Sequence, residues 1–271
     1  MEKTKIYTYM IPKKIHWCWL SGDPLPKNVQ DCVNSWKRMM PNYEIICWDR
    51  NRFDISVVPF VEQAYACRKY AFAADYIRLF ALYTEGGIYL DSDVMVFRRF
   101  DRFLSHSAFS SVEYVPAMIP WRNVENKYMG YAINGAMIAA EKGNLWIKQC
   151  LDHYKDKSFQ MKDGKIIGVD IVVDVLAHYA NKDWGFRYDD FTNEPQFLKD
   201  GIVIYPPSVF CGLWGPVNSQ TCALHLGEQA WIESVRQERR KESCFRKCYR
   251  YLCSHYRFFA WLHYRRKHLF D

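Results

Sequence analysis

The stretch from residue 70 to residue 93 constrains the fold more than any other part of this 271-residue chain. Residues 71–83 are good helix formers or large apolar residues on every face, without Gly or Pro, which predicts a helix buried on most sides. Gly86–Gly87 then ends the helix, and residues 88–90 are a short strand-forming run. We therefore expect a buried helix followed directly by a strand.

Two acids, Asp91 and Asp93, follow the predicted strand. Side chains two residues apart on a strand point the same way, so both carboxylates can face one small volume. Two like charges held that close would force one carboxyl to keep its proton unless a cation lay between them. Oxygen ligands of this kind suit Mg²⁺ or Mn²⁺, which keep coordination sites for phosphate oxygens. The pattern predicts a divalent cation that holds a diphosphate.

The predicted helix also carries two charged residues, Asp75 and Arg78, which lie three positions apart and share one face. Ionised groups inside a protein are costly unless they are paired or bound to a ligand. We expect that Asp75 and Arg78 either pair with each other or contact a bound substrate.

These motifs resemble the Asp-x-Asp sugar transferases of glycosyltransferase family 32. The resemblance rests on residues 70–93 and on the upstream run Ile-Pro-Lys-Lys-Ile-His-Trp-Cys-Trp at residues 11–19, and further blocks extend it to about Trp231. Within the family, the chain is most similar to bacterial capsular-polysaccharide synthesis enzymes, and it is also similar to the glucosylating domains of large clostridial toxins. The resemblance implies a GT-A type α/β fold, with a mixed, mostly parallel sheet flanked by helices.

The resemblance also implies roles for individual residues. Asp93 would coordinate Mn²⁺ or Mg²⁺ directly, and Asp91 would bridge the metal and the ribose of a nucleotide sugar, with UDP as the expected nucleotide. Asp75 and Arg78 would hold hydroxyls of the donor sugar, and Tyr89 would approach the nucleotide. Transfer with retention of configuration is implied by the family alone.

Two further residues have a structural and a functional interpretation. Trp19 lies near the end of a predicted buried strand, so its ring either belongs to the core or stacks on a base. The resemblance to the toxins favours stacking on uracil. Asn134 precedes a glycine, which is typical of a turn, but the family resemblance also allows a contact with a donor or acceptor sugar.

His225 is the expected third metal ligand, because a neutral imidazole adds a ligand without adding charge. The alternative is a core histidine. The spacing from His225 to Trp231 matches the family ending, in which Trp231 would close over the donor. The chain departs from that ending at Leu226, where the family has a second His, and at Ala230, where it has Ser. The lost hydroxyl puts a direct metal or phosphate contact at position 230 in doubt.

We predict that the chain has two parts, a catalytic domain at residues 1–235 and a tail at residues 236–271. The tail contains eleven Lys or Arg and three Asp or Glu. Because the formal net charge of the whole chain is +7, the predicted catalytic domain is nearly neutral. Its aromatic residues share one helical stripe, so it is either a helix that lies on an anionic membrane surface or one that packs on the domain. Elsewhere the patterns predict strands at 15–20, 43–48, 94–97, within 107–118, at 133–140 and ending at 203–207, and helices at 26–40, 59–68, 145–154 and 169–179.

The ten cysteines are scattered without a Cys-x-x-Cys pair, so we expect reduced thiols. No cleavable leader or uninterrupted apolar span is evident, which favours a cytoplasmic enzyme with peripheral contact at the cytoplasmic face of a membrane. The predicted function is transfer of a hexosyl group from a nucleotide sugar to a growing glycan, either lipid-linked or an oligosaccharide. The alternatives are a metal-dependent nucleotidyltransferase and a non-catalytic membrane or nucleic-acid binder, although the neutral body argues against nucleic acid.

Overall fold

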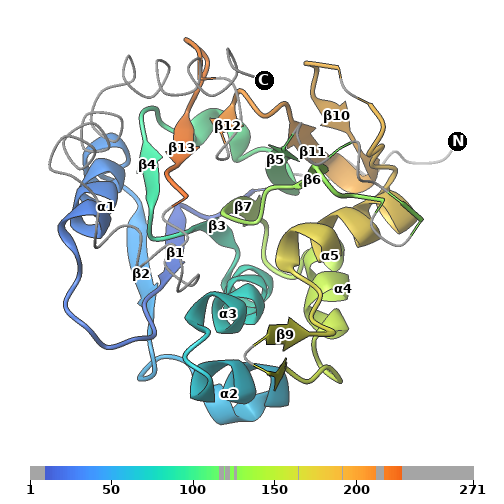
Figure 1. Cartoon of the computed structure of the whole chain (residues 1–271). Helices are drawn as coiled ribbons and strands as arrows, with labels where there is room; N and C mark the ends of the chain where they lie inside the picture. Colours follow the sequence, from blue (N-terminus) through green and yellow to red (C-terminus); the bar gives the residue numbers. More distant parts are fainter. Residues whose placement is uncertain are drawn as a thin grey trace, which may run out of the picture.

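The computed structural model describes residues 10–115, 119, 123–124, 127–163, 165–190, 192–211 and 217–227. Within these residues, the main element is an eight-stranded mixed sheet with the order β10-β11-β5-β7-β3-β1-β2, in which β6 also pairs with β5 (Figure 1). A smaller sheet has the order β12-β13-β4, and β8 and β9 form a hairpin. Helices pack against both faces of the main sheet, so the described part of the chain has an α/β architecture.

The bounds of the strands and helices are as follows. The strands are β1 Lys14–Cys18, β2 Glu44–Trp48, β3 Gly87–Leu90, β4 Val94–Val96, β5 Ala108–Tyr114, β6 Tyr131–Ile133, β7 Met137–Ala140, β8 Gln160–Lys162, β9 Lys165–Ile167, β10 Gln196–Phe197, β11 Ile202–Tyr205, β12 Phe210–Cys211 and β13 Ala223–His225. The α-helices are α1 Lys27–Met39, α2 Pro59–Ala66, α3 Tyr70–Glu85, α4 Leu145–His153 and α5 Val172–Tyr179, and the short helical turns are η1 Ile55–Val57, η2 Asp101–Phe103, η4 Ala180–Trp184 and η5 Lys199–Gly201.

The main sheet is mixed, and the expectation of a mostly parallel sheet is wrong. Strands β1, β2 and β3 run parallel, as do β5 and β11. Strand β7 runs antiparallel to both β3 and β5, and β6 and β10 are also antiparallel to their partners. The antiparallel β7 therefore joins two parallel groups, a feature that the periodicity of one strand does not encode.

Alternate residues of the central strands enter different cores. Ile88 and Leu90 of β3 pack with α1 and the small sheet, whereas Tyr89 faces the core formed with α2 to α5. Figure 1 shows α1 at the left of the sheet and α2 and α3 below it. A period of two with apolar residues on both sides is the pattern of a strand covered on both faces. The sheet is thus an internal layer.

Several predicted elements are confirmed, and two are wrong in detail. The predicted buried helix is α3, and the predicted helix at 26–40 is α1, whose inner side and the following Met40 are buried at Val29, Cys32, Val33, Trp36 and Met40. The predicted strand at 133–140 is two strands, β6 and β7, because the chain turns between them at Asn134–Ala136. Strands β8 and β9, which pair with each other, lie where no strand was predicted.

The junction between α3 and β3 is fixed by two glycines and a buried histidine. Gly86 and Gly87 have φ of +67° and +120°, and a Cβ on Gly86 would come within 2.6 Å of the Lys142 backbone nitrogen. The Trp48 indole N–H donates to His16 Nδ1 at 3.0 Å, so His16 Nε2 carries the hydrogen and donates to the Gly86 carbonyl at 2.8 Å. His16 thereby ties β1, β2 and the start of β3 together.

Within the described residues, no helix is both long enough and apolar enough to cross a bilayer. The described cysteines are all free thiols, as expected.

Replacing His16 by Leu should destabilise the fold, because the Trp48 indole N–H and the Gly86 carbonyl would both be buried without a partner. The expected loss is roughly 2–5 kcal/mol in the free energy of unfolding, measured by urea denaturation. His106→Leu is the control, since His106 is only partly buried and makes one side-chain hydrogen bond, to Tyr205 at 2.7 Å. Equal losses in the two variants would contradict the role assigned to His16.

Candidate active site

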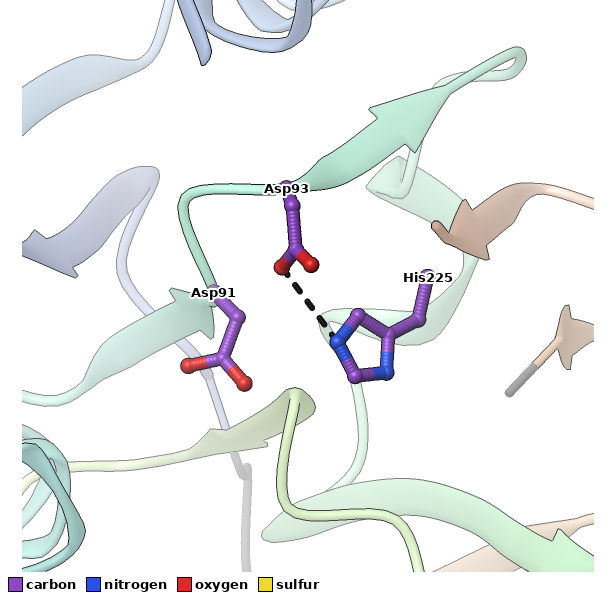
Figure 2. A group of neighbouring side chains, drawn as sticks. All are labelled: Asp91, Asp93 and His225. Carbon is purple, nitrogen blue, oxygen red and sulfur yellow. Dashed lines mark ion pairs between the residues drawn. The ribbon is translucent and has the colours of Figure 1, made fainter. Parts of the chain in front are cut away.

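The two acids of the Asp-x-Asp motif lie in a tight turn between β3 and β4. Asp91 donates its backbone N–H to the Ala136 carbonyl at 2.9 Å, and Val94 N–H donates to the Asp91 carbonyl at 3.0 Å. The two acids follow the strand, as predicted, but the turn and not the alternation of a strand brings their side chains together (Figure 2).

His225 reaches this turn from the small sheet. Strand β13 pairs antiparallel with β4, and the pairing sets His225 opposite Val94, directly beside Asp93. His225 Nε2 lies 3.3 Å from Asp93 Oδ1, and the Leu226 N–H donates to the Asp93 carbonyl at 3.0 Å. Figure 2 shows the side chains of Asp91, Asp93 and His225 pointing toward one another. The predicted grouping of these three residues is present in the structure.

The charges of this group favour a bound cation. Burial alone would lower the pKa of His225, but Asp93, Asp91 and Glu113 raise it to about 9. A metal ion needs the neutral imidazole, so a metal and a proton compete for the same Nε2.

The three residues fit a small divalent ion. One ligand atom from each of Asp91, Asp93 and His225 lies within 4.8 Å of the others. Two carboxylates and one imidazole are a donor set that Mn²⁺ accepts, and the set leaves coordination sites for a ligand.

Arg78 is the centre of the ionic contacts behind this turn. Its side chain is 4% exposed, and its Nη2 lies 2.8 Å from Asp75 Oδ1 while its Nη1 lies 3.4 Å from Asp91 Oδ1. Nη1 also donates to the Gly135 carbonyl at 2.6 Å, and the guanidinium lies 4.6 Å from the centre of the Tyr89 ring. Burial opposes the charge of Arg78, but Asp91, Tyr89 and Asp75 raise its pKa and keep it charged. Arg78 thus connects α3 to the acidic turn and to the turn before β7.

Asp75 pairs with Arg78, which is one of the two alternatives that the sequence analysis gave. It also accepts a hydrogen bond from the Val172 backbone N–H, at the start of α5. Burial raises the pKa of Asp75, and Arg78 opposes that increase. The predicted contact of Asp75 and Arg78 with a donor sugar stays a prediction.

Tyr89 and Asn134 support the site from inside the protein. Tyr89 is 1% exposed, and its hydroxyl donates to Asp91 Oδ1 at 3.0 Å. Asn134 is fully buried, and its Oδ1 accepts from the Ala136 N–H at 2.9 Å. This geometry agrees with the turn interpretation of Asn134. An added Cβ at the adjacent Gly135 would meet Val172 Cγ1 at 2.6 Å, so a larger residue there would have to displace the Val172 side chain.

Trp19 lies just beyond the end of β1, at the same edge of the sheet as the acidic turn. The parallel register pairs His16 with Tyr89, so the next residues of β1 run toward Asp91. The Cys18 thiol is close enough to Arg78 and Asp91 for its pKa to respond to both charges. Trp19 itself is half-buried, and its indole N–H donates to the Asp23 carbonyl at 2.7 Å. Its contact with a base stays a prediction, whereas Trp17 is buried in the core.

Trp231 and the tail at residues 236–271 lie outside the described residues. Two residues of the site were missed by the sequence analysis, namely Gly135 and Glu113. Gly135 contributes only its carbonyl, which no side-chain pattern reveals. Glu113 lies in a strand of small and apolar residues, so its charge at that position could have indicated a functional role.

Replacing Arg78 by Lys should destabilise the protein, because one ammonium cannot reach Asp75, Asp91 and the Gly135 carbonyl together. The expected loss is roughly 3–5 kcal/mol in the free energy of unfolding. Arg52→Lys is the control, because Arg52 is more exposed and pairs with Glu85 at 2.6 Å. This substitution should lower the free energy of unfolding by less than about 1 kcal/mol. Urea denaturation of both variants tests this, and similar losses would contradict a central role for Arg78.

Comparison with known proteins gives a family for part of the chain. Residues 26–110 match the model described as "Glycosyltransferase sugar-binding region containing DXD motif". "Subversion of eukaryotic traffic protein A" of Legionella pneumophila is 29% identical over 173 residues, a match that covers 52% of this chain and 24% of that protein. "Inositol phosphoceramide mannosyltransferase 3" of Schizosaccharomyces pombe is 32% identical over 126 residues, covering 45% of this chain and 33% of that protein.

This chain therefore spans about a quarter to a third of the length of these two curated relatives. Among solved structures, "PaToxG Glycosyltransferase" is 20% identical with a TM-score of 0.46, over 64% of this chain and 70% of that one. The Asp91-Ser92-Asp93 turn falls inside the matched residues. Residues 26–110 of the chain are thus similar to the glycosyltransferase sugar-binding region that contains a DXD motif.

Proposed function

We propose that this chain is a metal-dependent glycosyltransferase of GT-A type that transfers a hexosyl group from a UDP-linked sugar to a growing glycan. The observation that carries the proposal is the convergence of Asp91, Asp93 and His225 beside the buried Arg78. The match of residues 26–110 to a sugar-binding DXD region supports the same function.

Asp91, Asp93 and His225 would hold Mn²⁺ or Mg²⁺. When bound, this ion supplies Lewis-acid stabilisation to the departing diphosphate. The contacts of Asp91 with Tyr89 and Arg78 keep its carboxylate oriented before substrate arrives. Such preorganisation lowers the cost of reaching the transition state.

Other parts of the proposal rest on the resemblance to glycosyltransferase family 32. These are stacking of Trp19 on the base, closure by Trp231, contact of Asp75 and Arg78 with the donor sugar, and retention of configuration. A role in capsular or other surface polysaccharide assembly, in the cytoplasm at the inner face of a membrane, has the same support. The basic tail at residues 236–271 would add the contact with anionic lipid.

Replacing Asp93 by Asn should abolish turnover, because the amide removes one charge from the cation site while keeping the size of the side chain. We expect UDP release from UDP-glucose, UDP-galactose or UDP-N-acetylglucosamine with Mn²⁺ to fall by at least about a hundredfold. The melting temperature should stay nearly unchanged.

Asp163→Asn is the matched control, since Asp163 lies exposed in the β8-β9 turn with φ of +51°, which Asn adopts readily. Normal turnover by the Asp93 variant would refute the assignment of the acidic turn. Release of pyrophosphate from UTP and a sugar 1-phosphate by the unmodified protein, without release of UDP from the UDP-sugars, would favour the nucleotidyltransferase alternative.

A further inference from the structure

Glu113 of β5 projects from the face of the main sheet that carries the small sheet. Ser111, two residues earlier, donates its hydroxyl to the Phe210 carbonyl of β12 at 2.7 Å. Side chains two residues apart on a strand share a face, so Glu113 points the same way as Ser111. Strand β12 pairs with β13, which ends at His225. The strand geometry therefore directs Glu113 toward the candidate active site.

The electrostatic interactions agree with this placement. Burial raises the pKa of Glu113, while nearby His225 lowers it and Asp91 raises it. Glu113 in turn raises the pKa of His225. The carboxylate thus lies within electrostatic reach of residues at both sides of the cation group.

Glu113 lies beside the cation group and is not one of its ligands. The set of ligand atoms within 4.8 Å of one another contains Asp91, Asp93 and His225, without Glu113. Glu113 is half-buried and keeps some contact with solvent. Its carboxylate therefore lies near the cation group without being committed to it, and a ligand bound there is within its reach.

The other acids of the site already have protein partners. Asp75 and Asp91 contact Arg78, and Asp93 contacts His225. Within the described residues, the Glu113 carboxylate makes no hydrogen bond or ion pair with the protein. A half-buried carboxylate that pairs with no other protein group keeps its capacity to accept a hydrogen bond from a ligand.

We propose that the Glu113 carboxylate accepts a hydrogen bond from a hydroxyl group of a bound sugar. This inference rests on the proposed glycosyltransferase function. Hydrogen bonds from hydroxyls to a carboxylate are short and strong, so one such bond would fix the orientation of the sugar relative to the diphosphate. The hydroxyl belongs either to the hexosyl group of the donor or to the acceptor, since both offer the same chemistry.

The test compares Glu113→Gln with the unmodified protein in two measurements. The first is UDP binding with Mn²⁺ by calorimetry, which should change by less than about twofold, because UDP has no hexosyl group. The second is turnover of UDP-glucose, UDP-galactose and UDP-N-acetylglucosamine, with water or with glucose, galactose or mannose as acceptor. Turnover should fall on the order of ten- to a hundredfold. Loss of hydrolysis assigns the hydroxyl to the donor, and loss of sugar transfer alone assigns it to the acceptor.

Glu141→Gln is the matched control. Glu141 is also half-buried with a pKa raised by burial, but it follows Ala140, which pairs with Gly87 at the opposite end of β3 from Asp91. Its substitution should change neither measurement.

Two results with Glu113→Gln would overturn the inference and leave the proposed function intact. The first is unchanged turnover. The second is a loss of Mn²⁺-dependent UDP binding above about tenfold, which would assign Glu113 to the metal and diphosphate. Absence of UDP binding and turnover in the unmodified protein would instead overturn the proposed function, and the inference with it.

Discussion

The buried guanidinium of Arg78 is the interaction on which the site depends. A charge with 4% exposure is stable inside a protein only when acids and carbonyl groups surround it closely. Here the surrounding groups come from α3, from the turn after β3 and from the turn before β7. Removing any of them would leave a buried charge short of a partner, so the ion pairs specify how these three segments sit relative to one another.

The sequence allowed prediction of those features that depend on local pattern. The helix α3, the glycine break and the strand β3 follow from composition and periodicity, and the acidic turn follows at the end of the strand. The pairing of Asp75 with Arg78 follows from their spacing on one helix. These interactions connect residues that are close in the chain, and physical rules for helices and strands are sufficient for them.

Other features depend on contacts between distant segments and could not be predicted from pattern alone. The antiparallel position of β7 in the sheet and the break at Asn134–Ala136 arise from packing against β3 and β5. The position of His225 was predicted only by resemblance, since nothing in its own neighbourhood indicates pairing with Val94. Glu113 was overlooked because a single acid in a strand has no distinctive spacing.

The antiparallel pairing of β13 with β4 has a consequence for how the protein matures. Asp91 and Asp93 are synthesised early, whereas the imidazole that completes the cation site comes from the last described strand. A nascent chain that has formed α3 and β3 would hold the two carboxylates, with Arg78 beside Asp91, before His225 is available. Cation binding and completion of the small sheet are therefore thermodynamically linked, and each would stabilise the other.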